Sequence, residues 1–192
     1  AYPAAVELAR IVRRADPRTR LIIGGAHASV LPEHILKTQP EFDFVCTGEG
    51  EDVMLELAAA VQKEGTVNDF SCINGLAWRS SDGKVVINHP REPRTLLDDL
   101  PFPARHLVDF ERFSLHSHVG MEVERSATMI TSRGCPFKCI FCSAHLVHGR
   151  KYRFHSDEYV VSEIRSLIAE YGIKYIFFED DTFTAVPVRL KR

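Results

Sequence analysis

Three cysteines with metal-binding spacing are the residues of this sequence best suited to chemistry. Cys135, Cys139 and Cys142 follow the pattern C-x3-C-x2-C in a stretch that also contains Gly134 and Pro136. Thiolates are soft ligands that favour iron–sulfur clusters, zinc or copper, and ligands so close in sequence reach one centre with little loss of loop entropy. A four-iron cluster ordinarily takes four cysteines. Three ligands without an obvious fourth would leave one iron open to bind another molecule.

Other interpretations of the three thiols are open at this level. The spacing Cys142-x2-His145 is tolerable for a structural zinc site, with His145 or His148 as the fourth ligand. The thiols could also be unligated. An electron-transfer ferredoxin is less favoured, because a fourth cysteine does not lie nearby. The remaining cysteines, Cys46 and Cys72, stand in apolar surroundings and are expected to be ordinary buried residues.

The cysteine segment resembles the cluster-binding loop of the radical SAM superfamily. The stretch Thr131-Ser-Arg-Gly-Cys-Pro-Phe-Lys-Cys-Ile-Phe-Cys142 has the spacing of that loop, with the aromatic Phe141 before the last cysteine. The resemblance implies that Cys135, Cys139 and Cys142 hold a [4Fe–4S] cluster and that S-adenosylmethionine (SAM) chelates the fourth iron. It further implies reductive cleavage of SAM to a 5′-deoxyadenosyl radical, with Phe141 among the cofactor-binding residues. An electron donor such as flavodoxin or ferredoxin would be a partner.

An acidic run, Glu179-Asp-Asp181, follows a strand predicted at 173–178. Carboxylates at the end of a buried strand can bind a cationic group such as an ammonium. The surrounding stretch Phe177-Phe-Glu-Asp-Asp-Thr-Phe183 resembles the pattern at the second barrel strand of the same superfamily, where the amino group of SAM is bound. The resemblance assigns Asp180 and Asp181 to SAM. The alternative is that these acids cap the next turn.

The elements expected before the cysteines alternate between helix and strand. Leu8, Ile11 and Val12 stand at helical spacing and predict an amphipathic helix at 3–15. The apolar patterns further predict strands at 20–24 and 42–46, a helix at 32–37 and another that begins at Glu51. Such alternation with short loops is typical of a doubly wound α/β sheet.

A glycine-containing loop follows each of these two strands. Ligands of such sheets bind beyond the carboxyl ends of the strands, and glycine lets the backbone approach a ligand closely. Neither loop matches a P-loop or a GxGxxG fingerprint, so on their residues alone both could be tight turns without a ligand. With the cysteines downstream, however, the stretches Leu21–Glu33 and Asp43–Glu51 resemble the cobalamin-binding domain of one large radical SAM subfamily.

The resemblance implies a groove for the nucleotide tail of cobalamin. The residues that would line it are Gly24, Gly25, His27, Gly48, Glu49 and Gly50. The Asp-x-His-x-x-Gly motif with which some cobalamin proteins ligate cobalt is absent from the sequence. His27 is therefore expected to cap a loop or to contact the tail.

Three regions are expected along the chain. Residues 1–70 form a partial cobalamin-binding α/β domain, and residues 71–126 form a small connecting hairpin with a proline-rich interdomain linker. Residues 127–192 form the N-terminal part of a radical SAM barrel, whose first strand, at 127–132, leads into the cysteines. The expected fold class is α/β, a partial Rossmann-like cobalamin-binding domain followed by the start of a TIM-like barrel.

The bulk composition is that of an ordinary globular protein. Of 192 residues, 45% are hydrophobic and 26% charged, and the net charge of −2 gives no reason to expect nucleic-acid binding. The sequence contains no apolar run near the ~20 residues of a membrane helix, and it does not open on a signal peptide. Five cysteines, three of them clustered, favour a reducing compartment, the cytoplasm.

The chain reads as an internal piece of a longer protein, since it begins without Met and ends at Arg192 soon after a predicted strand. For the whole protein, the resemblance implies SAM cleavage with cobalamin, leading to methylation of an unreactive carbon in a small-molecule substrate, or to rearrangement or ring closure. The piece alone is expected to be inactive, because two β/α units cannot close an eight-stranded barrel. The alternative is a zinc-stapled, non-catalytic α/β binding module.

Overall fold

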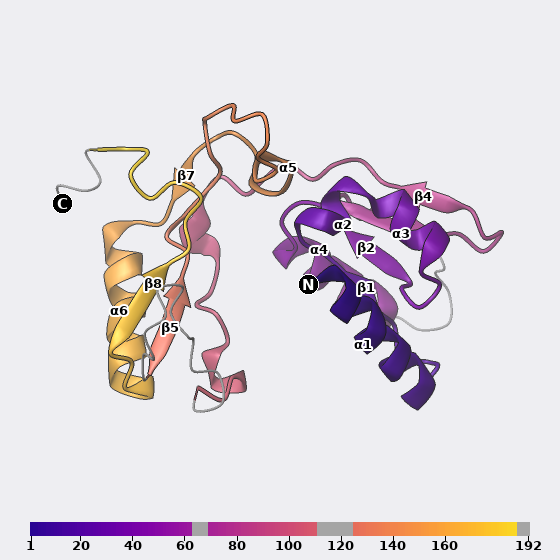
Figure 1. The fold of residues 1–192 in the computed structure, drawn as a ribbon, viewed down its shortest axis with the longest axis horizontal. Helices are drawn as coiled ribbons and strands as arrows, with labels where there is room; N and C mark the ends of the chain where they lie inside the picture. The colour runs from indigo at the N-terminus through magenta and orange to yellow at the C-terminus, as the bar shows by residue number, and fades with distance from the viewer. Residues whose placement is uncertain (63–68, 111–124, 188–192) are drawn as a thin grey trace. The chain divides into compact units, whose positions relative to one another are not determined.

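The computed structural model describes residues 1–62, 69–110 and 125–187 (Figure 1). These residues form two compact units. The first consists of Ala1–Pro93 together with Cys139–His148, and the second contains the remaining described residues from Arg94 onward. In the part of the chain that the structure describes, none of the helices is long and apolar enough to cross a membrane.

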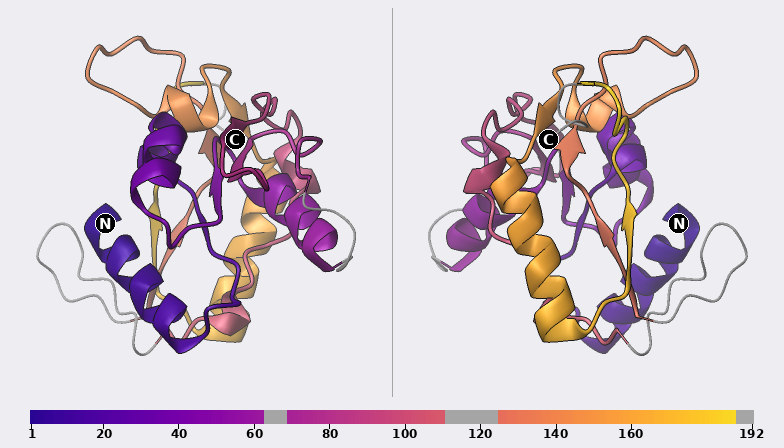
Figure 2. Two further views of the ribbon diagram at one scale, coloured as in Figure 1. Left: turned by 90° about the vertical axis from the view of Figure 1, so that its right-hand side faces the viewer. Right: turned by 90° about the vertical axis from the view of Figure 1, so that its left-hand side faces the viewer.

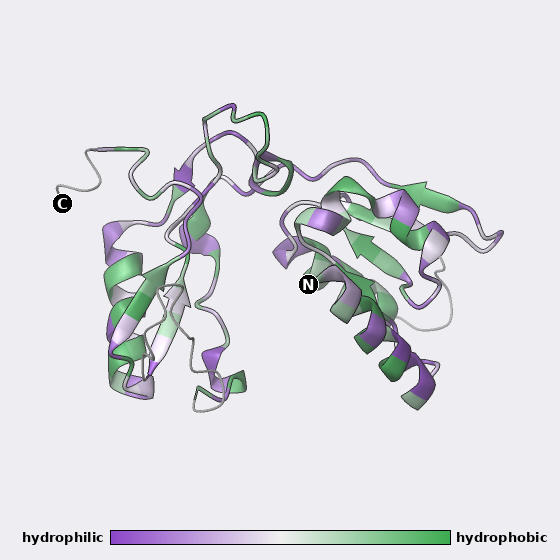
Figure 3. Ribbon diagram, in the orientation of Figure 1, coloured by the Kyte–Doolittle hydropathy of each residue, from purple (hydrophilic) through white to green (hydrophobic). Residues whose placement is uncertain are grey.

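A four-stranded sheet forms the centre of the first unit. Its strands, in spatial order, are β1 (Ile22–Ile23), β2 (Phe44–Cys46), β3 (Leu76–Arg79) and β4 (Val85–Ile87). The pair β1–β2 is parallel, whereas β3 and β4 are antiparallel. The colouring of Figure 3 shows how hydrophobic these strands are. The predicted hairpin exists as β3–β4, but β3 pairs with β2, so the hairpin extends the sheet and is not a separate ribbon.

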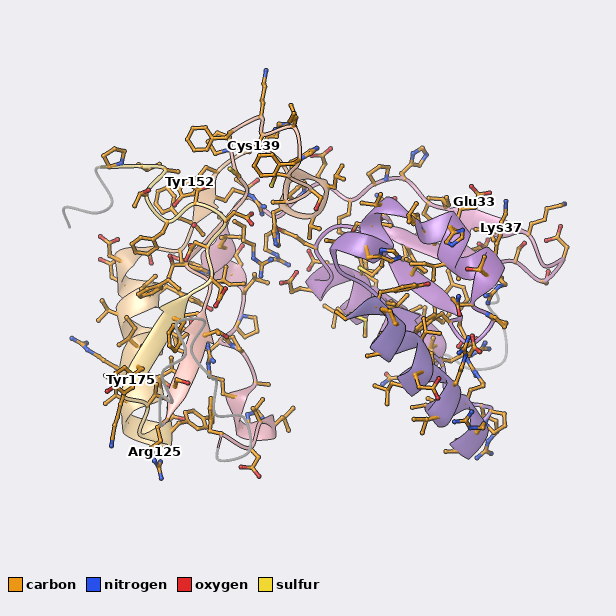
Figure 4. All side chains as sticks on the ribbon, in the orientation of Figure 1. Glu33, Lys37, Arg125, Cys139, Tyr152 and Tyr175 are labelled. Carbon is orange, nitrogen blue, oxygen red and sulfur yellow. The ribbon has the colours of Figure 1, made fainter. Side chains whose placement is uncertain are left out.

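Helices cover both faces of this sheet. They are α1 (Tyr2–Ala15), α2 (Ala26–Val30), α3 (Pro32–Thr38) and α4 (Glu51–Gln62), and the short α5 (His145–His148) lies against α2. Val45 of β2 packs with the apolar residues of α1, α2 and α3, whereas Phe44 and Cys46 pack with Val53 and Leu57 of α4. Alternate residues of one strand thus face opposite layers. The outer side of α3 carries the Glu33–Lys37 ion pair, labelled in Figure 4.

Helix α1 was predicted correctly, but the face that it buries was not. Val6 and Ala9 are buried, whereas Leu8 and Ile11 are 61% and 49% exposed. The reason is Arg13, which shares the face of Val6 and Ala9. Its guanidinium donates to the Asp43 carboxylate at 2.8 Å and to backbone carbonyls of the following loops. These bonds rotate the helix so that this face, and not the Leu8 stripe, meets the sheet.

The second unit contains a parallel strand pair joined by a helix. Strands β5 (Ser126–Met129) and β8 (Tyr175–Phe178) are parallel neighbours, and α6 (Asp157–Tyr171) lies between them in the chain. Figure 2 shows α6 as one uninterrupted helix. The side chain of Ser156 caps its first turn and Gly172 ends it with a φ of 62°. This β/α arrangement is the start of a barrel-type fold.

Two short strands flank the cysteine segment. The predicted strand at 127–132 is in fact divided into β5 and β6 (Ser132–Arg133), and β6 pairs antiparallel with β7 (Arg153–Phe154). The sequence patterns did not predict β7. It was missed because two residues per strand are too few for an alternating pattern to show.

Residues 94–110 of the expected linker belong to the second unit, whereas the linker residues up to Pro93 belong to the first. Residues 94–110 contain two 3-10 helices, η1 (Leu97–Asp99) and η2 (Arg105–Leu107). Leu97 is buried, and the guanidinium of Arg105 donates to the carboxylate of Glu163 on α6 at 2.6 Å. The rest of the expected linker, residues 111–124, lies outside the described residues.

Candidate functional site

The two glycine loops lie at one edge of the first unit's sheet. Because β1 and β2 are parallel, the loops that follow them, Gly24–Gly25 and Gly48–Gly50, leave the same edge. Ser29 of α2 joins them. Its hydroxyl donates to the carbonyl of Gly25 at 2.9 Å and accepts a hydrogen bond from the N–H of Gly48 at 3.0 Å. Sequence reasoning missed Ser29, since its partner loops are brought together only by the fold.

Glycine is required at two positions of these loops. The φ of Gly25 is 94° and that of Gly48 is 77°, values that side-chain-bearing residues rarely adopt. Gly24, Gly25 and His27 are exposed, and the ring of His27 lies 4.0 Å from the ring of Tyr2. Gly48, Glu49 and Gly50 are half-buried. The fold therefore gathers the predicted cobalamin-groove residues at one sheet edge.

Glu49 makes a contact that ties the second glycine loop to the segment beyond the cysteines. His148, the last residue of α5, places its Nδ1 3.1 Å from a carboxylate oxygen of Glu49. The Glu49 side chain is 8% exposed and that of His148 is 27% exposed. Both residues belong to the first unit. The zinc interpretation treats His148 as a metal ligand, whereas in the structure its ring is engaged with a carboxylate.

The ends of the cysteine segment are held together in the second unit. The β6–β7 ladder brackets it. Two hydrogen bonds join the chain between the two strands of this ladder. The N–H of Cys135 donates to the carbonyl of Gly149 at 3.4 Å, and the guanidinium of Arg150 donates to the carbonyl of Phe137 at 2.6 Å. Hydrogen bonds between its first and last residues therefore close this stretch at its two ends.

The three thiols stand on irregular backbone within this segment. Cys135 is half-buried, while Cys139, labelled in Figure 4, and Cys142 are exposed. The N–H of Cys142 donates to the carbonyl of Cys139 at 3.2 Å, which forms a turn, and the Phe141 side chain within this turn is 89% exposed. Among the described residues, no three His, Cys, Asp or Glu side chains are gathered as a single metal ion would require.

The donor set fits an iron–sulfur cluster. In a four-iron cluster each cysteine sulfur binds a different iron, so the thiols need not converge on one point. Softness, accessibility and close sequence spacing are the properties required, and all three cysteines have them.

The two aspartates assigned to SAM have different surroundings. The carboxylate of Asp180 accepts hydrogen bonds from the N–H of Thr131 at 3.2 Å, from its hydroxyl at 2.9 Å and from the hydroxyl of Ser132. Thr131 and Ser132 are buried. Asp181 is exposed. The oxygens of Asp180 are thus occupied by the residues that precede the cysteines, whereas Asp181 faces solvent.

The other two cysteines differ from each other. Cys46 is buried as expected, and burial, together with the Glu51 carboxylate, raises the pKa of its thiol, so that it stays protonated. The expectation that Cys72 is buried was wrong, because its side chain is exposed. A turn precedes Cys72, in which the Ser71 N–H donates to the Asp69 carboxylate. Ile73, the residue after Cys72, packs into the core instead.

Two protein-family models match the chain. Residues 1–58 match the B12 binding domain, and residues 129–191 match the radical SAM superfamily. The first match includes both glycine loops, and the second includes the three cysteines and the acidic run after β8.

Longer proteins are similar over almost the whole chain. An uncharacterized methyltransferase of Pyrococcus horikoshii is 36% identical over 94% of this chain and 37% of its own length. The anaerobic magnesium-protoporphyrin IX monomethyl ester cyclase of Rubrivivax gelatinosus is 32% identical over 90% of this chain and 30% of its own length. The solved structure of the cobalamin-dependent S-adenosylmethionine radical enzyme OxsB superposes with a TM-score of 0.70 at 21% identity, over 96% of this chain and 24% of that chain. The chain thus spans between about a quarter and somewhat more than a third of these proteins, and its fold is similar to that of the solved structure.

Proposed function

Because the chain belongs to the cobalamin-binding branch of the radical SAM superfamily, we propose that it is part of an enzyme that methylates an unreactive carbon of a small-molecule substrate. The observation that carries the proposal is the order of the two matched segments, a B12 binding domain at residues 1–58 and then a radical SAM segment at residues 129–191. The methyltransferase similar over 94% of this chain supports methyl transfer as the reaction.

The first unit supplies the cobalamin site in this proposal. Backbone of the Gly24–Gly25 and Gly48–Gly50 loops lines the groove for the nucleotide tail, with His27 and Glu49 at its sides. The hydrogen bonds of Ser29 to both loops hold the two walls together. Positive φ angles at Gly25 and Gly48 leave the backbone without a side chain where the ligand passes.

The cysteines supply the cluster site. Cys135, Cys139 and Cys142 would hold a [4Fe–4S] cluster, which when bound supplies the electron that cleaves the sulfonium of SAM. Cys135 is oriented by the hydrogen bond of its N–H to the carbonyl of Gly149 and by the neighbouring β6–β7 ladder. Exposure of Cys139, Cys142 and Phe141 leaves them accessible to SAM and to an electron donor such as flavodoxin or ferredoxin.

Asp181 is the acid best suited to the amino group of SAM. Its carboxylate is exposed, and it follows β8 at the carboxyl end of a parallel strand, where barrel-type folds keep their chemistry. An ammonium–carboxylate hydrogen bond is charge-assisted and hence short and strong. Asp180 acts differently, holding Thr131 and Ser132 in place before the cysteines.

Ring closure is the second candidate reaction. The similarity to the magnesium-protoporphyrin IX monomethyl ester cyclase, at 32% identity over 90% of this chain, favours it specifically. Both reactions would use the same three cofactors. Incubation of the protein, expressed over the full length of its gene, with SAM labelled in the methyl group separates them, because only methylation transfers the label to product.

The cofactor assignment is tested on the purified chain. After anaerobic reconstitution with iron and sulfide, about four irons per chain and a brown colour are expected, and each of C135A, C139A and C142A should lower the iron content. C72A is the matched control, because Cys72 is an exposed cysteine outside this segment. A colourless protein with one zinc per chain would instead support the zinc-stapled binding module. Retention of hydroxocobalamin in equilibrium dialysis tests the first unit independently.

A further inference from the structure

We infer that Thr182 is a positioning residue for the iron–sulfur cluster, whose hydroxyl donates a hydrogen bond to the sulfur of Cys135 and thereby raises the reduction potential of the cluster. The inference rests on the proposed function, because it requires a cluster at the three cysteines. It concerns a residue outside the cysteine segment, in the turn that follows β8.

The contact itself is short and joins distant parts of the second unit. Thr182 Oγ1 lies 3.1 Å from Cys135 Sγ, across 47 positions of sequence, and both residues are half-buried. The turn that carries Thr182 is anchored to the strand that leads to Cys135, because Asp180 accepts hydrogen bonds from Thr131 and Ser132. Asp180 and Thr182 therefore fix the approach to Cys135 at two successive points.

The protons available at this contact define its direction. The hydroxyl of Thr182 has one proton and also lies 2.7 Å from the carbonyl oxygen of Asp181, which can only accept. While Cys135 is a thiol, its S–H can donate to Thr182 Oγ1, and the hydroxyl can donate to Asp181. A sulfur bound to iron has no proton and can only accept. A hydrogen bond at this contact then requires the hydroxyl to turn its proton toward Cys135, and water can replace it at the exposed Asp181.

A hydrogen bond to a cluster ligand changes the redox balance. Reduction adds negative charge to the cluster and its sulfurs, so a donor aimed at a ligand sulfur stabilises the reduced state more than the oxidised state. Among the described residues, neither Cys139 nor Cys142 has a side-chain hydrogen bond to its sulfur. Thr182 therefore distinguishes the Cys135 corner of the cluster from the other two.

The test is a redox titration of the reconstituted chain, followed by the electron paramagnetic resonance signal of the reduced cluster. T182V keeps the shape of the side chain and removes the hydroxyl, whereas T182S keeps the hydroxyl. At a fixed applied potential, T182V should lower the ratio of reduced to oxidised cluster by about tenfold, equivalent to ~59 mV for a one-electron couple. T182S should resemble the wild type. Thr184, exposed in the same turn and without a side-chain hydrogen bond among the described residues, provides the matched control T184V.

The outcomes separate this inference from the proposed function. If the wild-type chain binds no iron, the proposed function fails and this inference fails with it. If all variants bind iron and T182V has the wild-type potential, only the role of Thr182 is overturned. T182A covers the case in which valine is not accommodated, because alanine is smaller and also lacks the hydroxyl. A lowered potential in T182A that T182S does not share supports the inference equally.

Discussion

His148 places its imidazole Nδ1 3.1 Å from a carboxylate oxygen of Glu49, although 99 positions separate the two residues in the chain. Glu49 belongs to the loop after β2, and His148 ends α5, six positions beyond Cys142. The contact fastens the segment after the last cysteine to a loop of the predicted cobalamin groove. Both residues lie in the same compact unit.

Removing the His148 side chain should loosen α5. H148A deletes a hydrogen bond to a charged group that is itself largely buried, for which a loss of about 1.5 kcal/mol is typical. We expect the amides of Val147 and His148, which donate to Ala144, to exchange hydrogen about tenfold faster. Mass-spectrometric hydrogen exchange measures this. H145A, one turn earlier on α5, is the control, and equal exchange in both variants would contradict a role for the pair.

The two aspartates after β8 should respond differently to mutation. D180A removes the acceptor of at least three hydrogen bonds from Thr131 and Ser132, so we expect it to lower the stability of the second unit by about 2–3 kcal/mol. D181N should leave the melting temperature unchanged and weaken SAM binding. Calorimetric unfolding and equilibrium dialysis with the reconstituted protein measure the two effects. Normal SAM binding by D181N would transfer the amino-group contact to another residue.

Arg105 and Glu163 form an ion pair whose side chains are only 14% and 5% exposed. R105M and E163L should each lower the free energy of unfolding by about 3 kcal/mol, because each leaves one charge buried without its partner. The double variant should recover most of that loss. Urea unfolding followed by the near-ultraviolet signal of the tyrosines reports mainly on this unit, since four of the five tyrosines belong to it and Trp78 and Tyr2 belong to the other one. Additive losses in the double variant would show that the two residues do not act as a pair.

The stability of the second unit should fall as the pH is lowered, because of His155. Burial lowers the pKa of His155 below its ordinary value of 6.5, although the neighbouring Asp98, 3.0 Å away, opposes this shift. The unfolded chain therefore takes up a proton near pH 6.5 that the folded chain does not. Stability is fully present above pH 6.5 and is lost below it, by at most about 1.4 kcal/mol per pH unit.

The pH dependence has a direct test. Between pH 7.5 and 5.5 the wild-type free energy of unfolding should decline, and H155Q should flatten that decline whatever it does to the overall stability. H106Q, at an exposed histidine of the same unit, is the control. Titration of Asp98 does not contribute to the change in stability between pH 7.5 and 5.5. Burial acts to raise the pKa of Asp98, but hydrogen bonds from Ser156 and His155 outweigh it and lower the pKa, so its contribution is lost only below about 3.8.

The chain by itself should not convert SAM to 5′-deoxyadenosine. Among the described residues the barrel-type part contains one parallel strand pair, β5 and β8, and a substrate chamber requires many more strands. Chromatographic assay of 5′-deoxyadenosine under anaerobic, reducing conditions checks this expectation. Turnover by these 192 residues alone would show that further strands are not needed for the first chemical step.

Local sequence signals were sufficient for the longer helices and for most strands, but not for the short helices α2 and α5. Ser156 and Gly172 mark the two ends of α6 through capping geometry that depends on neighbouring residues alone. The face of α1 could not be obtained in this way. It depends on the bond between Arg13 and Asp43, which lie 30 positions apart, and a pattern within one helix carries no information about such a partner.

The candidate site also combines features that depend on local sequence with features that depend on contacts between distant residues. The cysteine spacing and the glycine loops are local patterns that the sequence alone displays, and the binding roles assigned to them remain predictions. The roles of Ser29, Thr182 and His148 are set by contacts between segments far apart in the chain, and so is the difference between Asp180 and Asp181. Polar residues of these types are common on any surface, so only their partners distinguish them.

The ladder between β6 and β7 sets the tolerance of the region to insertions. Because the β6–β7 pair holds the two ends together, residues can be inserted between Cys142 and Arg153 with little loss of stability. Doubling the length of a flexible loop raises the entropic cost of closing it by only about 0.6 kcal/mol. A slip of one residue in the β6–β7 pair itself would be far more damaging. Arg153 is 4% exposed and Phe154 is 47% exposed, and a one-residue shift exchanges the faces of a strand. Natural variation in length should therefore accumulate between Cys142 and Arg153 and should spare the paired residues of β6 and β7.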